Sequence, residues 1–142
     1  MTMVAACHFA DVAVIIADSR ATWVGSGVPI FQDELQKILP LGPKIGLAFA
    51  GDVAAAALIA QPLRRRLRRD ERARAVRKLA ADVPRIARHY YGIYKARTGR
   101  DRRLQLILCG ATELGQVGVW WFQSPHFGSH KLEDDFVVVG SG

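Results

Sequence analysis

Long apolar runs and cysteines are scarce in this chain of 142 residues. Its longest apolar stretches, at 12–17 and 53–60, are far shorter than the ~20 residues that span a bilayer, so we expect no membrane span. The two cysteines exclude a disulfide framework and a CxxC metal site. The four histidines lack metal-ligand spacing, and the first residues lack the features of a secretory signal. We therefore expect a cytoplasmic protein without a metal or cofactor.

The charge is unevenly distributed along a chain whose length allows one domain over residues 1–142. Half of the residues are apolar and 23% are charged, as in folded proteins. Between Arg64 and Arg103 lie 16 of the 20 Lys and Arg residues with four acids, so this segment carries +12 and the remainder −5. Such a segment could bind nucleic acid. However, apolar residues recur among the arginines at helical intervals, which favours solvated or partner-docking faces of amphipathic helices and makes nucleic acid the weaker alternative.

The first part of the chain reads as strands. Short β-branched runs at 4–7 and 12–17, with Asp11 at the turn between them, predict a hairpin buried on both faces. Cys7 lies in one of these runs, which indicates a core position. Residues 25–29 predict a loop, and 37–41 and 45–50 predict a second strand pair around Gly42 and Pro43.

Two helices and three further strands follow. Asp52 is a plausible N-cap for an Ala-rich helix at 52–67, and a second helical pattern runs from Arg72 to about Ala96. Pro84 should kink or divide that helix, with Asp82 capping its continuation. Strands are predicted at 104–109, 117–122 and 136–139. Sequential helices on one face of a sheet require a second sheet against the other face, which predicts a layered α+β fold.

Thr2 is the first residue with a chemical signal. Removal of Met1 would give it a free α-amine, whose ordinary pKa of about 8 lets it act as the base for its own hydroxyl. Many cytoplasmic proteins begin with Met-Thr, so the residue gains meaning only from its context.

That context is a series of motifs: Thr2-Met-Val, Val14-Ile-Ile-Ala-Asp-Ser-Arg-Ala-Thr22, Lys37-Ile, and Phe49-Ala-Gly-Asp-Val53. In order and spacing the series resembles proteasome β-type subunits and their HslV-like bacterial relatives, which are N-terminal nucleophile hydrolases. The helix pair, the strands at 104–122 and the closing Gly-Ser-Gly at 140–142 also match in order. The resemblance implies an αββα four-layer sandwich, of which one incomplete domain with only the N-terminal part is present.

The resemblance also implies a catalytic set. Thr2 matches the nucleophile, Lys37 the ammonium that helps move the proton, and Asp18 the carboxylate that holds this lysine. Gly51 matches the position whose N–H faces the oxyanion, where a missing Cβ lets the substrate backbone approach. Ser141 matches a serine that hydrogen-bonds near the terminal amine. Read singly, these residues are equally consistent with a strand-end ion pair, a surface lysine and a capped turn.

The resemblance further implies the substrate contacts and partners. An apolar primary pocket would select apolar side chains, because it offers no partner to a buried charge. Its residues would be Ala21, Leu35, Leu39, Phe49 and Val53, while Thr22, Gly51 and Val53 would pair with an extended substrate. The implied function is a threonine endopeptidase subunit acting on unfolded polypeptides, in a homo-oligomeric ring served by an ATPase unfoldase. An inactive fragment or structural subunit of the same fold is the alternative.

Two features depart from the family pattern. The interval from Asp18 to Lys37 is nineteen residues, about three more than usual, which the loop at 25–29 could absorb. The family's later helices and strands, with an Asp and a second Ser that support the threonine, are missing here. We therefore expect an apolar sheet face and unpaired strand edges.

Overall fold

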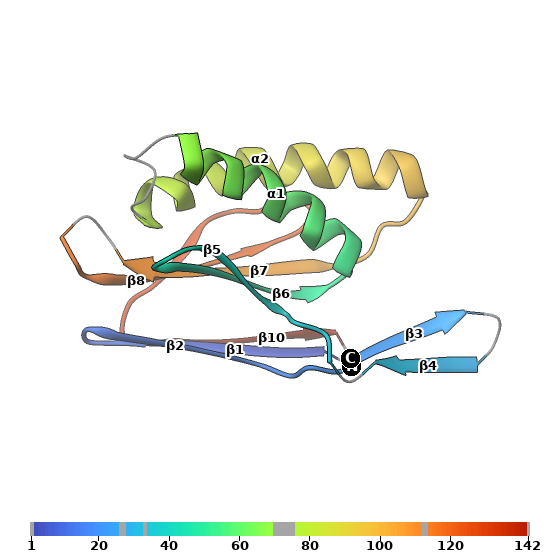
Figure 1. The fold of residues 1–142 in the computed structure, drawn as a ribbon, viewed down its shortest axis with the longest axis horizontal. Helices are drawn as coiled ribbons and strands as arrows, with labels where there is room; N and C mark the ends of the chain where they lie inside the picture. The colour runs from blue at the N-terminus through green and yellow to red at the C-terminus, as the bar shows by residue number, and fades with distance from the viewer. Residues whose placement is uncertain (1, 26–27, 33, 70–75, 112–113, 142) are drawn as a thin grey trace.

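The computed structural model describes residues 2–25, 28–32, 34–69, 76–111 and 114–141, and of residues 21–25, 28–32 and 141 it describes the backbone alone. The chain begins with a three-stranded antiparallel sheet in the order β10-β1-β2, built from β1 (Thr2–Phe9), β2 (Val12–Ala17) and β10 (Phe136–Ser141). A separate hairpin of β3 (Ala21–Gly25) and β4 (Val28–Gln32) projects from one end of the molecule (Figure 1).

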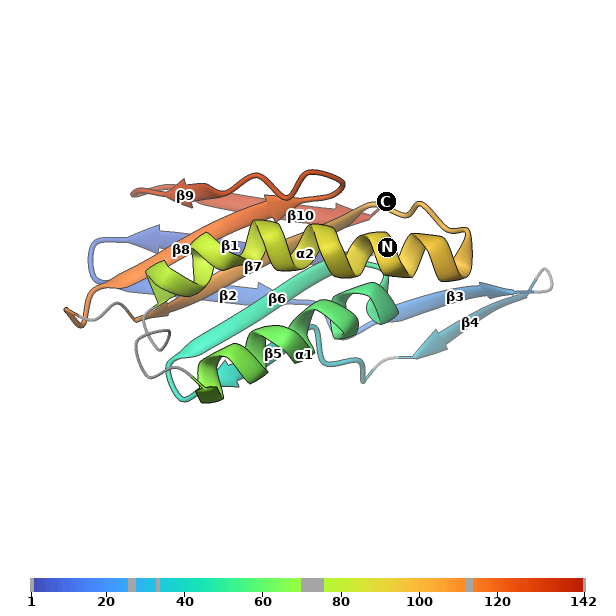
Figure 2. The same cartoon turned by 90° about the horizontal axis from the view of Figure 1, so that it is seen from above.

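The second sheet has five antiparallel strands in the order β5-β6-β7-β8-β9. They are β5 (Ile38–Gly42), β6 (Ile45–Gly51), β7 (Leu104–Ala111), β8 (Val117–Gln123) and β9 (His130–Leu132). Helices α1 (Val53–Arg69) and α2 (Val76–Thr98) cover one face of this sheet, and the three-stranded sheet covers the other (Figures 1 and 2). The layered α+β fold is therefore confirmed, with three layers formed by the described residues.

Two apolar clusters fill the spaces between these layers. The larger cluster joins the helices to the five-stranded sheet and includes Ile59, Leu79 and Phe122. The smaller one joins the two sheets and includes Val4, Ile107 and Val139. Alternate residues of β7 enter different clusters, because successive side chains of a strand point to opposite faces.

The helix termini follow the capping rules. The Asp52 carboxylate accepts hydrogen bonds from the backbone N–H groups of Ala54 and Ala55 at 2.9 and 3.1 Å, which confirms it as the N-cap of α1. Gly99 ends α2 with a φ of 66° and donates its N–H to the Lys95 carbonyl at 2.9 Å. None of the helices in the described ranges is both long and apolar enough to cross a bilayer.

The first hairpin differs from its prediction. The outer face of the three-stranded sheet is exposed, so the expectation of burial on both faces is wrong. No described element covers this face (Figure 1). Cys7 is exposed on it, not in the core. The large apolar side chains it exposes are Met3, Phe9, Val12, Val14, Ile16, Phe136 and Val138.

Other boundaries also differ. Of the expected loop at 25–29, Gly25 belongs to β3 and residues 28 and 29 belong to β4. Residues 26 and 27 lie outside the described residues, as do 70–75 at the expected start of the second helix. Helix α2 is continuous through Pro84, so the expected division is wrong. Asp82 does not begin a helix: its carboxylate pairs with Arg66 and Arg85. The three-residue strand β9 was not expected, because it is too short to show a period.

Candidate active site

An ion pair joins the buried Lys37 to the partly exposed Asp18. The side chain of Lys37 is 1% exposed and that of Asp18 is 32% exposed. The Lys37 ammonium donates to Asp18 Oδ1 and to the backbone carbonyl of Arg20. The Lys37 carbonyl accepts the N–H of Phe49 at 3.1 Å, which fixes the lysine beside β6. A cation this deeply buried requires such partners.

The same carboxylate holds the start of β1. Asp18 Oδ2 accepts the backbone N–H of Met3 at 2.9 Å, and the Asp18 N–H donates to the Met3 carbonyl at 3.1 Å. The Lys37 ammonium and the peptide group that links Thr2 to Met3 therefore share one carboxylate. Thr2 is half-buried and alternates with the exposed Met3, so it shares the inner face of β1 with Val4. The structure thus brings Thr2, Asp18 and Lys37 to one end of the sheets.

Gly51 ends β6 with a φ of 120°, a conformation that L side chains rarely adopt. A Cβ at this position would lie 2.2 Å from the carbonyl oxygen of Arg103, because Gly51 pairs with Leu104 of β7. The sequence suggested that the missing Cβ makes room for a substrate. The structure supplies a different requirement, the close approach of the neighbouring strand.

Ser141 lies opposite Thr2 in the pairing of β10 with β1. Its backbone continues β10, and its side chain lies outside the described residues, as does Gly142. The neighbouring Gly140 is packed tightly, since a Cβ there would lie 2.5 Å from the Thr2 carbonyl oxygen. The ends of β1 and β10 are therefore in close backbone contact at Thr2.

The expected substrate residues fall in separate places. Leu35 lines an open cavity of about 600 Å³ together with Asp18, Lys37 and Pro40. Phe49 is 2% exposed in the cluster beneath the helices, and Leu39 and Val53 pack against that cluster. The side chains of Ala21 and Thr22 lie outside the described ones. A single apolar pocket built from all five residues stays a prediction.

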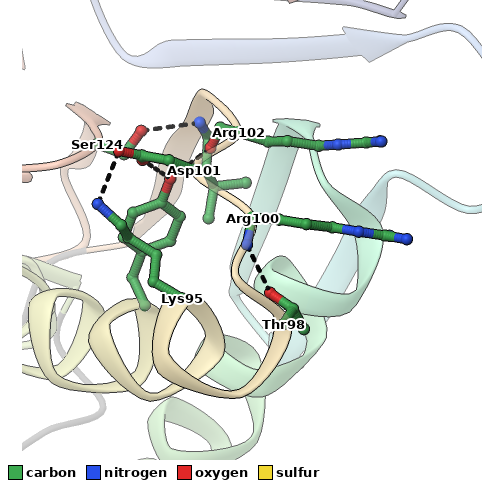
Figure 3. A network of polar contacts seen from close by, with 8 residues as sticks. Lys95, Thr98, Arg100, Asp101, Arg102 and Ser124 are labelled. Carbon is green, nitrogen blue, oxygen red and sulfur yellow. Dashed lines mark hydrogen bonds and ion pairs between the residues drawn. The ribbon is translucent and has the colours of Figure 1, made fainter.

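A polar network anchors the end of α2 to the segment that leads into β7 (Figure 3). Lys95 pairs with Asp101 at 2.7 Å, and the Tyr91 hydroxyl donates to the Asp101 carboxylate at 3.1 Å. The Lys95 ammonium, followed by this hydroxyl, holds the pKa of Asp101 below its usual range. Burial is the main cause that raises the pKa of Tyr91. The Leu104 N–H donates to the Ser124 hydroxyl at 2.9 Å. The segment that leads into β7 is therefore bonded to α2, and the first residue of β7 is bonded to Ser124.

Tyr94 links α2 to the cap of α1. Its hydroxyl donates to Asp52 Oδ2 at 2.6 Å, and burial followed by this hydrogen bond raises the pKa of Tyr94. The residue after Gly51 is therefore held by both helices.

One polar residue at the site was missed from the sequence. Gln105 is 5% exposed, and its side chain bonds to Gly140 next to Thr2. The available signal was an amide in an otherwise apolar strand. Within the described ranges, no group of three or more His, Cys, Asp or Glu side chains could hold a metal ion.

A family model described as proteasome subunit matches residues 2–142. The chain belongs to the proteasome subunit family. Among solved structures it is similar to the helical assembly of the Anbu complex from Pseudomonas aeruginosa, with 19% sequence identity and a TM-score of 0.77. The match covers 97% of this chain and 60% of that chain. No curated protein matches the sequence.

These findings confirm the family resemblance and the fold class. The chain has the proteasome-type fold of N-terminal nucleophile hydrolases, and it spans 60% of the length of the Anbu chain that it matches. At 19% identity, that likeness shows the fold and no more.

Proposed function

We propose that this proteasome-family chain is a threonine-type endopeptidase subunit with Thr2 as its N-terminal nucleophile. The observation that carries the proposal is the Lys37–Asp18 pair, whose carboxylate also holds the backbone next to Thr2. A buried ion pair is often no more stabilising than an apolar pair of the same size. A cation held beside the first strand is therefore better explained by chemistry than by stability.

We infer the following reaction. After removal of Met1, the Thr2 α-amine takes the hydroxyl proton as the oxygen attacks the carbonyl carbon of a peptide bond. The Gly51 N–H would donate to the developing oxyanion. The proton passes to the leaving amine, which leaves an ester between Thr2 and the acyl part of the substrate. Water then hydrolyses this ester, again with the α-amine as base. In this proposal the Lys37 ammonium stabilises negative charge during both steps, and Ser141, whose backbone pairs with Thr2, supports the amine.

The proposed substrates are unfolded polypeptides, and the proposed assembly is a homo-oligomer. One observation supports assembly, since the Anbu neighbour is a helical assembly. An ATPase that delivers unfolded chains would complete such a system.

The test of Thr2 combines mass and activity. We expect the intact mass of the purified assembly to show loss of Met1, and a fluorogenic peptide to be hydrolysed. Thr2→Ala should abolish hydrolysis, whereas Thr2→Ser should retain part of it because the hydroxyl and the amine remain. Retention of Met1 in a sample that cleaves peptides would refute the assignment of Thr2 as the nucleophile. Retention of Met1 in an inactive assembly would instead favour a structural subunit.

The test of the pocket uses a panel of peptides. We expect faster cleavage after Leu or Tyr than after Arg or Glu, because the proposed pocket residues carry no charge. Phe49→Ala should shift the preference toward bulkier side chains, but Phe49 is 2% exposed and its truncation costs about 3–5 kcal/mol. Phe49→Leu is the gentler variant. Its matched control is Phe122→Leu, in the same cluster on β8, which should leave the preference unchanged. Equal preferences in the two variants would refute the role of Phe49.

A further inference from the structure

Gln105 is a buried amide at an otherwise apolar position. In β7, Leu104, Leu106 and Leu108 face the helices, whereas Gln105 and Ile107 face the three-stranded sheet. Gln105 is 5% exposed. Burial of an amide is unfavourable unless its hydrogen-bonding groups find partners, so its partners show what the residue holds.

These partners connect the two sheets. Gln105 Oε1 accepts the backbone N–H of Gly140 in β10 at 3.2 Å. Gln105 Nε2 donates to Gln123 Oε1 in β8 at 3.3 Å, and the same oxygen accepts a hydrogen bond from Arg103 at 3.0 Å. A series of side chains thus runs from the exposed Arg103, through Gln123 and Gln105, to the backbone of β10.

The Gly140 end of this series is in contact with Thr2. Gly140 pairs with Met3, and Ser141 pairs with Thr2. A Cβ on Gly140 would lie 2.5 Å from the Thr2 carbonyl oxygen, so the two backbones are in close contact and a shift of Gly140 toward β1 would displace Thr2.

The Gln105 end of the series belongs to the segment that also fixes Gly51. Leu104 pairs with Gly51, and the Arg103 carbonyl leaves no room for a Cβ there. This segment is anchored in turn by the network at the end of α2 (Figure 3). Residues 103–105 therefore contact β10, which pairs with the strand that carries Thr2, and β6, which carries Gly51.

We propose that Gln105 is a positioning residue, which sets the place of Thr2 relative to Gly51 by tying β10 to β7. The inference rests on the proposed function, in which Thr2 attacks a carbonyl whose oxygen turns toward the Gly51 N–H. An error of about 1 Å between two such groups can lower turnover by about 100-fold, while substrate binding depends on more distant contacts.

The experiment compares three variants of the full chain in its native assembly. Gln105→Met keeps the size of the side chain and removes both hydrogen bonds. Gln105→Glu keeps an oxygen that can accept the Gly140 N–H. Ile107→Val is the matched control, because Ile107 lies on the same face of the same strand, two residues further from the site. Measured quantities are kcat and KM for one fluorogenic peptide, the thermal midpoint, and the rate of amide hydrogen exchange at Gly140.

We expect Gln105→Met to lower kcat by about 10- to 100-fold with KM within about twofold, and to speed exchange at Gly140. Gln105→Glu should recover part of the kcat, and Ile107→Val should leave both kcat and the exchange rate near wild type at a comparable thermal midpoint. If the change in kcat is proportional to the change in thermal midpoint, with the same proportion in all three variants, the inference is overturned. If the wild type shows no hydrolysis that depends on Thr2, the proposed function is wrong. The exchange measurement then decides the role of Gln105 alone, and equal exchange at Gly140 in Gln105→Met and Ile107→Val overturns it.

Discussion

The unequal burial of Lys37 and Asp18 predicts that their two substitutions differ in cost. In Lys37→Met the remaining Asp18 carboxylate is 32% exposed and still accepts the N–H of Met3. Water can reach it, so we expect a loss of about 1–3 kcal/mol in the free energy of unfolding. In Asp18→Asn the remaining ammonium is 1% exposed and keeps, among the residues that the structure describes, the Arg20 carbonyl and the new amide as hydrogen-bond partners. A buried charge without its counter-charge costs about 3–5 kcal/mol.

The double variant sharpens this prediction. Asp18→Asn with Lys37→Met removes both charges, so it should be more stable than Asp18→Asn alone, although it carries one more substitution. Lys131→Met is the control, because the side chains of the Lys131–Glu133 pair are 50% and 74% exposed. Such an exposed pair contributes little, so this substitution should leave the free energy of unfolding nearly unchanged.

The assay is urea unfolding at pH 7, followed by tryptophan fluorescence at one fixed protein concentration. Each variant is also tested for peptide hydrolysis, where Lys37→Met should lower turnover by orders of magnitude while assembly persists. If Asp18→Asn proves no more destabilising than Lys37→Met, or if the double variant is the least stable of the three, the reasoning from burial is refuted. Near-normal turnover in Lys37→Met would refute the catalytic role alone.

Two further predictions concern stability. Gly51→Ala should destabilise the protein by at least about 1–3 kcal/mol and stop turnover, since a Cβ there meets a carbonyl at 2.2 Å and the φ of 120° is strained. Gly92→Ala, inside α2 with nothing within 4 Å of the added Cβ, should raise the free energy of unfolding by about 0.5–1 kcal/mol. Equal thermal midpoints in these two variants would contradict the argument. The raised pKa values of Tyr91 and Tyr94 mean that the folded state holds their protons more tightly. The stabilisation that these two protonated hydroxyls contribute is complete below pH 10 and is lost as the pH rises through their folded-state pKa values. The double variant Tyr91→Phe, Tyr94→Phe lacks both hydroxyls. Its free energy of unfolding, measured with urea, should therefore fall less steeply above pH 10 than that of the wild type.

The sequence by itself determined much of the element order and the family. Alternating and helical apolar periods placed both helices and most strands, and Asp52 marked the start of α1, because these signals depend on neighbours within a few residues. The spacing of Thr2, Asp18, Lys37 and Gly51 carried the family resemblance, which the family match confirms. Motifs in a fixed order and spacing can be recognised from the sequence without a structure.

Other properties were decided by contacts between segments far apart in the sequence. The apolar runs of β1 and β2 could not show which face is covered, because a buried and an exposed valine read alike. Helix α2 continues through Pro84, where the local preference alone predicts a break.

At the candidate active site, too, some properties could be predicted from the sequence and others depend on the tertiary structure. Sequence spacing proposed Asp18 and Lys37 together, but only the tertiary structure shows that one carboxylate serves both the buried ammonium and the backbone beside Thr2. The sequence shows Gln105 as an amide in an apolar strand but not its role at the site, because its partner Gly140 lies thirty-five positions away. Likewise, the need for glycine at position 51 arises from the Arg103 carbonyl on another strand. Local propensity acts over one or two turns of chain, whereas close approach and hydrogen bonding between the layers exist only once the sheets have packed.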